Sequence, residues 1–329
     1  MTRFIEFSTL NKITISLKSV SVHAARPSRR PYTLFKGQTM TQEYFRPRTV
    51  QEALSLLQEK PGQGRVIAGG TDLLVEQAKP SRKSPRLVDL GWIPGMKDIR
   101  EEGGFLVFGA CVTHSQAEQS PLVRRHARAL AEGCGKVGSR QIRNMGTLAG
   151  NIVSALPAAD AGVTLTALGA VCVVASPDGV RELPMTAMYH GVGKSAVNAC
   201  AECITQIKVP LAGAGTGSAY ARMEQRKALS LPMLCVAARV TLENGLMRGV
   251  SIVMAPAGPA PRHAAKAERL LEGQAPDAGL FARAGELARE EAEFRSSAVR
   301  GSKEYREGVL PVFVRRALAR AAERAAGGE

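Results

Sequence analysis

Apolar and polar positions alternate in short blocks through the N-terminal part of the chain. After a short strand, Thr49 precedes four apolar residues on one helical face, so it is expected to cap a helix that ends before Pro61-Gly62. Compact apolar runs bounded by turn residues predict strands, and they read RVI, RLVDL, FLVFGACVTHS and CITQIKVP. Helices are expected over 121–133 and 160–170, with a hairpin around 177–179. This pattern predicts an α+β region.

A run of small residues separates this region from a second one. Residues 212–217 are mostly glycine and alanine, and we interpret them as a linker. Beyond the linker, Asn244-Gly245 separates two apolar runs and strongly predicts a hairpin. Helical patterns follow at 264–272, 278–292 and 309–325. We therefore expect a C-terminal α+β layer, a three-stranded antiparallel sheet with helices on one face.

Two glycine-rich turns carry the candidate chemistry. The first reads AGGTDLL over residues 68–74, and the second reads GTLAGNI over residues 146–152. Glycine leaves no side chain between backbone amides and a ligand, so either turn could hold a diphosphate. Taken alone, however, a glycine pair in a loop more often makes only a tight turn. Neither turn has the spacing GxGxxG or GxxxxGK[ST], which excludes the usual dinucleotide and P-loop motifs.

Nine blocks follow one another in a fixed order from about residue 41 to residue 322. They read FRPRTVQEALSLLQE, VIAGGTDLLVEQAK, LVDLGWIPGMKDI, GACVTHSQ, RQIRNMGTLAGNIVSALPAAD, ECITQIKVP, YARMEQRKALSLPMLCVAARV, APAGPAPRHAAKAERLLEG and GSKEYREGVLPVFVRRALARA. Together they resemble the FAD-binding medium subunits, or central domains, of the xanthine dehydrogenase and carbon monoxide dehydrogenase family of molybdenum hydroxylases. Chance supplies one glycine turn easily but not this whole order, so the resemblance makes both turns strong candidates.

The resemblance implies a fold and a cofactor. Residues 40–211 would form a PCMH-type FAD-binding domain, similar to that of vanillyl-alcohol oxidase and built of two α+β subdomains. Residues 216–325 would form a domain similar to the C-terminal domain of carbon monoxide dehydrogenase flavoproteins. One FAD would bind non-covalently, because residues 68–72 hold neither the histidine nor the cysteine of a covalent flavin link.

The resemblance also implies roles for individual residues. The first turn would bind the FAD diphosphate through backbone amides of Val66, Ile67, Ala68, Gly69, Gly70, Thr71, Asp72 and Leu73. The second would close over the same phosphates and the ribityl chain with Thr147, Leu148, Ala149, Gly150 and Asn151. Asp160 would hydrogen-bond the polar chain of the flavin, Ile204 would pack on the isoalloxazine, and Arg222 would place a cation near the ring. No residue of the chain is expected to act as a general base.

Three positions depart from the family's pattern. Ala149-Gly150 stands where a Gly-Gly pair is usual, and its extra methyl group is tolerable only if the φ angle is negative. Leu156-Pro157 replaces a Ser-Pro pair, which puts a hydroxyl contact to the ribityl chain in doubt. Met223 stands where an aromatic residue is frequent.

The net charge of +15 is most concentrated at the N-terminus. Residues 1–39 hold seven Lys or Arg and one acidic residue, whereas basic and acidic residues interleave beyond them. This composition is typical of a transit peptide or of a translated upstream stretch, so we expect the fold to begin near Met40. The extension has no aromatic interleaving and no recognition motif, and we do not expect the protein to bind nucleic acid.

Cysteine usage and hydropathy suggest a cytoplasmic protein without a membrane span. The six cysteines are scattered and are expected to be thiols, and no apolar stretch approaches the roughly 18 residues that a spanning helix needs. Cys200 and Cys203 have the spacing of half a metal site, but no second pair or nearby histidine completes it. We expect no metal or iron–sulfur cluster in this chain.

The function that the resemblance implies is electron transfer within a larger oxidoreductase. Electrons would arrive from two-iron two-sulfur clusters of a small partner subunit and leave to NAD or another acceptor, while a large partner subunit would hold the molybdopterin. Two alternatives stay open at this point. One is a stand-alone FAD-dependent oxidoreductase of the same fold, and the other is a basic scaffold protein that has lost its flavin.

Overall fold

The computed structural model describes residues 32–33, 43–77, 84–226, 229–298 and 300–328. The basic extension predicted over residues 1–39 lies outside these ranges except for strand β1, Tyr32–Thr33, which pairs antiparallel with β2. No helix in the described ranges is both long enough and apolar enough to cross a membrane.

A small sheet forms the first subdomain. Its strands lie in the order β1-β2-β4-β3, with β2 at Glu43–Phe45, β4 at Arg86–Asp89 and β3 at Gly64–Ile67. β2 and β3 both run parallel to β4. Helix α1, Val50–Gln58, connects β2 to β3, and such a crossover helix is the usual connection between parallel strands. Thr49 Oγ1 accepts a hydrogen bond from the Glu52 amide at 3.1 Å, which confirms the predicted helix cap. β3 is an edge strand, and the first glycine turn follows it directly.

A five-stranded antiparallel sheet forms the second subdomain, in the order β5-β6-β11-β7-β8. Its strands are β5 Ile99–Glu102, β6 Phe105–Gly109, β11 Cys203–Pro210, β7 Val171–Ser176 and β8 Gly179–Pro184. Two short strands, β9 Tyr189–Gly191 and β10 Lys194–Ser195, pair separately. The β7–β8 hairpin turns at residues 177–178, within the predicted segment.

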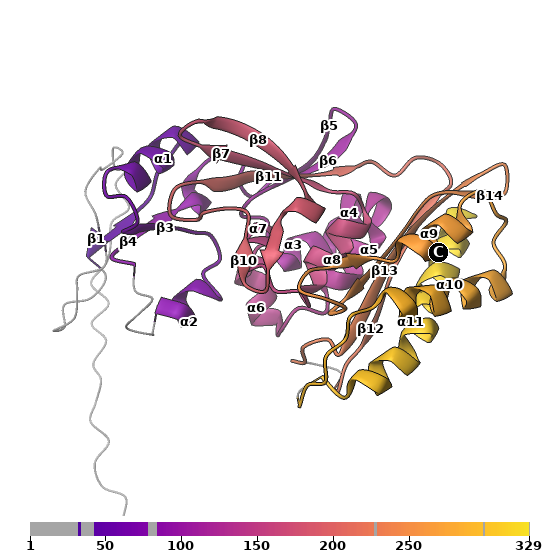
Figure 1. Ribbon diagram of the computed structural model, residues 1–329. Coiled ribbons are helices and arrows are strands. Elements are labelled where there is room, and N and C mark those ends of the chain that lie inside the picture. The colour runs from indigo at the N-terminus through magenta and orange to yellow at the C-terminus, as the bar shows by residue number, and fades with distance from the viewer. Residues whose placement is uncertain (1–31, 34–42, 78–83, 227–228, 299, 329) are drawn as a thin grey trace, which may run out of the picture. The chain divides into compact units, whose positions relative to one another are not determined.

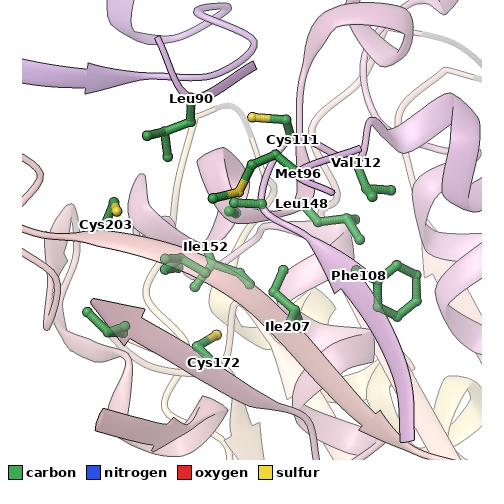
Figure 2. Close-up of a cluster of buried hydrophobic side chains, with 14 of the residues drawn as sticks. Leu90, Met96, Phe108, Cys111, Val112, Leu148, Ile152, Cys172, Cys203 and Ile207 are labelled. Carbon is green, nitrogen blue, oxygen red and sulfur yellow. The ribbon is translucent and has the colours of Figure 1, made fainter. Parts of the chain in front are cut away.

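Short helices cover this second sheet. They are α3 His114–Gln119, α4 Pro121–His126, α5 Arg128–Cys134, α6 Arg140–Met145, α7 Leu148–Val153 and α8 Asp160–Ala167. The single helix predicted over 121–133 is wrong, because Ala127, with φ −144° and ψ 51°, separates α4 from α5. Figure 2 shows side chains of β6, β11 and α7 packed into one core, among them Phe108, Ile207 and Ile152.

The C-terminal domain is a four-stranded antiparallel sheet with helices on one face (Figure 1). Its elements are β12 Thr216–Met223, β13 Leu234–Glu243, β14 Leu246–Ala255, β15 Arg262–His263, α9 Ala265–Leu271, α10 Ala278–Glu291 and α11 Lys303–Ala325. The α+β class is as predicted, but the prediction of three strands missed one. Helix α11 begins at the Ser302 cap, ahead of the predicted start, and continues through Pro311.

Strand β12 was missed because its small residues resemble a linker. A Cβ atom on Gly217 would lie 2.1 Å from the Ala321 carbonyl oxygen of α11, so glycine is needed here for close packing. The small residues of β12 therefore reflect contact with a helix, and β12 begins at Thr216, inside the predicted linker.

Both faces of the C-terminal sheet are buried. Val236, Ala238 and Ile252 pack with the helices of the same domain. On the opposite face, Ala237 and Val253 belong to a buried cluster with residues of α5 and α8 of the N-terminal region. This second contact joins the C-terminal sheet to the helices that carry the polar residues described below.

Candidate functional site

The first glycine turn presents a row of backbone amides without protein partners. It follows edge strand β3 and leads into helix α2, Leu73–Gln77. The amides of residues 69–72 donate no hydrogen bond to any described residue. Gly70 has φ +72°, a conformation that favours glycine. Because buried or half-buried amides are normally paired, an unpaired row at a turn indicates a place for an acceptor-rich ligand.

The second turn is the start of a helix rather than a free loop. Thr147 caps α7, and its Oγ1 accepts a hydrogen bond from the Gly150 amide at 3.1 Å. The Asn151 amide donates to the Thr147 carbonyl, and the Leu148 amide donates to the Val112 carbonyl, both at 3.0 Å. Three of the amides that we expected to face phosphate are therefore already engaged within the protein. What this turn can still offer a ligand is the Asn151 side chain and the amides of Thr147 and Ala149, which donate to no described residue.

The two turns touch each other directly. A Cβ atom on Gly69 would lie 1.9 Å from the Met145 carbonyl oxygen, at the end of α6. Ser154 Oγ, just beyond α7, donates a hydrogen bond of 2.7 Å to Asp72 Oδ2. Segments about eighty residues apart are thus joined by a backbone contact and a side-chain hydrogen bond. Gly69 permits this approach because it has no side chain.

One cavity of about 610 Å³ is lined by both turns. That volume is within the usual range for a cofactor or ligand site. The predicted residues that line it are Val66, Ile67, Ala68, Gly69, Gly70, Thr71, Asp72, Leu73, Thr147, Gly150 and Asn151. Among its charged residues, Arg65 is paired with Glu76 at 3.3 Å, so the cavity depends mainly on amides to attract an anion.

Two buried polar atoms in the cavity lining lack a hydrogen-bond partner among the described residues. They are Asn151 Oδ1 and His114 Nδ1. Buried polar atoms usually have partners, so these two atoms mark an incompletely satisfied wall of the cavity. His114 was not predicted as a site residue from the sequence, although it lies in the block GACVTHSQ and directly follows the helix cap Thr113.

Burial sets the charge of His114. It lowers the pKa of the imidazole from the ordinary value of 6.5 to about 4, and Arg143 contributes in the same direction. Asp72 opposes the shift. The ring is therefore neutral at pH 7 and can either donate or accept a hydrogen bond.

We expect His114 to make the protein sensitive to acid. The unfolded chain binds the proton below pH 6.5 while the folded chain resists it until about pH 4, so stability is lost as the pH falls through this window. The His114→Gln variant should show a smaller loss of unfolding free energy between pH 7 and pH 4.5, by roughly 2–3 kcal/mol. Urea unfolding at the two pH values measures it. His190→Gln, at an exposed position, is the control and should behave as wild type.

Three predicted site residues lie in the core beside the cavity. Leu148, Ala149 and Ile204 are at most 6% exposed and do not line it. Figure 2 shows Leu148 directed into the cluster that contains Phe108 and Ile207. Ala149 is the second residue of α7 and is not among the residues with positive φ, so its methyl group, which departs from the usual Gly-Gly pair, is accommodated by the core.

Asp160 and Arg222 form a buried ion pair away from the cavity lining. Arg222 Nε lies 3.3 Å from Asp160 Oδ1, and the two side chains are 4% and 8% exposed. Tyr220 donates a hydrogen bond to the same carboxylate oxygen at 2.5 Å. Burial raises the pKa of Asp160, and Arg222 opposes this effect. Asp160 starts α8 and Arg222 belongs to β12, so the pair joins the N-terminal region to the C-terminal sheet.

Metal ligands do not gather in the described part of the chain. No group of three or more His, Cys, Asp or Glu residues there could hold a metal ion. Cys203 is buried on β11 with its pKa raised to about 12 by burial, and all six cysteines are free.

Two domain families match the chain. A model described as the FAD binding domain in molybdopterin dehydrogenase matches residues 38–212. The CO dehydrogenase flavoprotein C-terminal domain matches residues 218–321.

Individual proteins match over similar ranges. The nicotinate dehydrogenase FAD-subunit of Eubacterium barkeri is 33% identical over 235 residues, covering 70% of this chain and 79% of that protein. The carbon monoxide dehydrogenase medium chain of Afipia carboxidovorans is 30% identical, covering 86% and 97%. A solved chain of carbon monoxide dehydrogenase from Hydrogenophaga pseudoflava superposes with a TM-score of 0.80 at 28% identity, covering 86% of this chain and 98% of that one.

Proposed function

Because the chain belongs to the family of FAD-binding medium subunits of molybdenum hydroxylases, we propose that it passes electrons from iron–sulfur clusters of a small partner subunit to NAD or another acceptor. The family makes it an oxidoreductase subunit with FAD as its cofactor. When bound, FAD exchanges two electrons as a hydride or single electrons in sequence. The rest of the site must bind this cofactor, orient it and limit its contact with water.

The observation that carries the proposal is the convergence of both glycine turns on one cavity. A diphosphate removed from water needs hydrogen-bond donors, and the amides of residues 69–72 supply them without burying a lysine. Asn151 and His114 line the same cavity, and each has one buried polar atom without a partner among the described residues. We assign residues 69–72 to the diphosphate, and Asn151 and His114 to the polar groups next to it.

Apolar residues complete the lining. Val137, Ile142, Leu156 and Val192 line the same cavity, and the last three are 40%, 48% and 61% exposed. A bound planar ring would cover part of this apolar surface, which favours binding. Leu156 replaces the serine of the usual Ser-Pro pair, so at this position the chain offers an apolar contact.

The remaining predicted residues support the site from behind. We propose that Leu148 and Ala149 anchor α7 to the core and that Ile204 forms the apolar floor beneath it. Asp160 and Arg222 hold the C-terminal sheet to α8. The family resemblance implies a further role for both residues, which is contact with the flavin.

The proposed partners are a small subunit with two-iron two-sulfur clusters and a large subunit with molybdopterin. This assignment rests on relatives described as a medium chain and a FAD-subunit. In the described part of the chain, no group of three or more His, Cys, Asp or Glu side chains could hold a metal ion in place of these partners.

Reduction of the purified FAD-loaded chain by NADH tests the acceptor. Under anaerobic conditions we expect NADH to bleach the flavin absorbance, because hydride transfer is reversible and needs no partner.

We also expect tagged protein expressed with its gene neighbours to copurify with the two proposed subunits. Bleaching by an organic substrate without partners would support the stand-alone oxidoreductase, and a protein that stays colourless with excess FAD would support the scaffold.

A further inference from the structure

A second cavity, of about 330 Å³, is strongly basic. It lies where α4 and the start of α5 meet the C-terminal sheet and the end of α11, and it shares no lining residue with the FAD cavity. We call its basic lining residues the arginine groove: Arg124, Arg125, His126, Arg128, Arg239 and Arg324. Among the described residues that line this cavity, none is Asp or Glu. Like charges without counter-charges repel one another, so their convergence needs an explanation.

Most charges of the groove are not neutralised by the residues that the structure describes. Arg125 and Arg128 are exposed and have neither an ion pair nor a hydrogen bond within the described ranges. Arg124 has one hydrogen bond, from Nε to the Glu118 carbonyl. Arg324 differs, because its Nη2 lies 2.5 Å from Glu132 Oε1.

Arg239 is the least expected member of the groove. It sits in β13, on the face of the C-terminal sheet that packs against the FAD-binding region, paired with Ser218. Its Nη2 donates to the Gly249 carbonyl at 3.3 Å, and its Nε is buried without a hydrogen-bond partner. It makes no ion pair with a described residue. A guanidinium group does not lose its proton in proteins, so this half-buried positive charge has only the longer-range attraction of Glu268 to offset its burial.

A second lining residue, His126, also has a buried nitrogen without a partner among the described residues. His126 Nε2 lies 3.0 Å from Glu101 Oε1, while its Nδ1 is buried without a partner. Across the cavity, the hydroxyls of Thr216 and Thr241 lie 3.0 Å apart. The groove therefore combines permanent cations, unpaired nitrogens and hydroxyl groups, which together match the oxygens of a phosphate-bearing ligand.

We propose that the arginine groove binds a small phosphate-bearing anion, of the size of a diphosphate or a mononucleotide, between the FAD-binding and C-terminal domains. The cavity volume fits a ligand of this class and is too small for a folded partner segment. Because the lining comes from α4 and α5 on one side and from β12, β13 and α11 on the other, the ligand would neutralise both sides of the domain contact. Binding would thus stabilise that contact.

Calorimetric titration of the FAD-saturated chain with inorganic diphosphate tests the proposal. We expect one site per chain, with affinity that falls as salt is added, because exposed charges are screened. Arg239→Met should weaken binding about tenfold, because a charged hydrogen bond contributes about this factor. In the double variant Arg125→Ala/Arg128→Ala, each of the two replacements should also weaken binding about tenfold. The double variant changes only exposed side chains and should fold normally.

Matched controls separate this site from general charge and from the FAD site. Arg315→Ala/Arg316→Ala removes the same charge from exposed positions of α11 outside the groove and should leave diphosphate affinity within twofold of wild type. A Gly69→Ala chain, which is expected to bind FAD poorly and is therefore titrated without it, should still bind diphosphate at the groove. Equal weakening by both arginine pairs, or loss of binding in Gly69→Ala, would overturn the proposal. So would a groove variant that keeps diphosphate binding but loses copurified subunits, which would identify a protein-docking surface instead.

Discussion

Replacing Gly69 with alanine is expected to give a folded protein that is nearly colourless. The added Cβ atom would lie 1.9 Å from the Met145 carbonyl oxygen, so the first turn must move away from α6. Movement displaces the amides of residues 69–72 from the proposed diphosphate position. Losing two hydrogen bonds to an anion costs about 3–6 kcal/mol, so FAD affinity should fall more than about a hundredfold. Titration of apoprotein with FAD, followed by flavin fluorescence, measures it.

Two further variants make this result specific. Gly213→Ala adds the same methyl group where no atom lies within 4 Å, and it should bind FAD as wild type does. Asn151→Leu keeps the turn contact but removes a polar side chain of the cavity, and we expect an intermediate loss of about tenfold. FAD affinity within threefold of wild type in a folded Gly69→Ala protein would contradict the assignment of the first turn to the diphosphate.

The sequence predicted both turns, but it did not show which of their backbone amides are free to bind a ligand. Glycine spacing indicated flexible backbone at residues 68–70 and 146–150, and the resemblance joined them into one site. The geometry distributes their roles unevenly: residues 69–72 have free amides, whereas the Gly150 and Asn151 amides are used to begin α7. A local pattern could not reveal this, because the difference depends on whether Thr147 adopts a helix-cap conformation.

Features that depend on contacts between distant parts of the chain were harder to predict from the sequence. His114 is defined by burial beside the second turn, and the block GACVTHSQ that contains it does not by itself show that burial. The arginine groove draws Arg239 from the C-terminal sheet to Arg125 and Arg128 of the FAD-binding region, so a charge count along the chain finds only interleaved acids and bases. β12 looked like a linker because Gly217 serves contact with α11 rather than flexibility.

The Arg222→Met substitution is expected to destabilise the fold strongly. It would leave the Asp160 carboxylate buried without the cation 3.3 Å away, and it would remove hydrogen bonds to the carbonyls of Lys136 and Ser230. Removing one partner of a buried pair typically costs about 3–5 kcal/mol, which is a large share of the stability of a domain. Urea unfolding at pH 7 measures the free energy directly.

Neutralising the carboxylate as well should recover part of this loss. In the Asp160→Asn/Arg222→Met variant the Tyr220 hydroxyl can still donate to the amide oxygen, so the double variant should be more stable than the sum of the two single effects predicts. FAD affinity of this variant then separates two roles for the pair. If the pair only joins α8 to the C-terminal sheet, affinity should stay within about threefold of wild type. A loss of tenfold or more in the folded double variant would instead support the direct contact with the flavin that the family resemblance implies, because a charged hydrogen bond is worth about that factor.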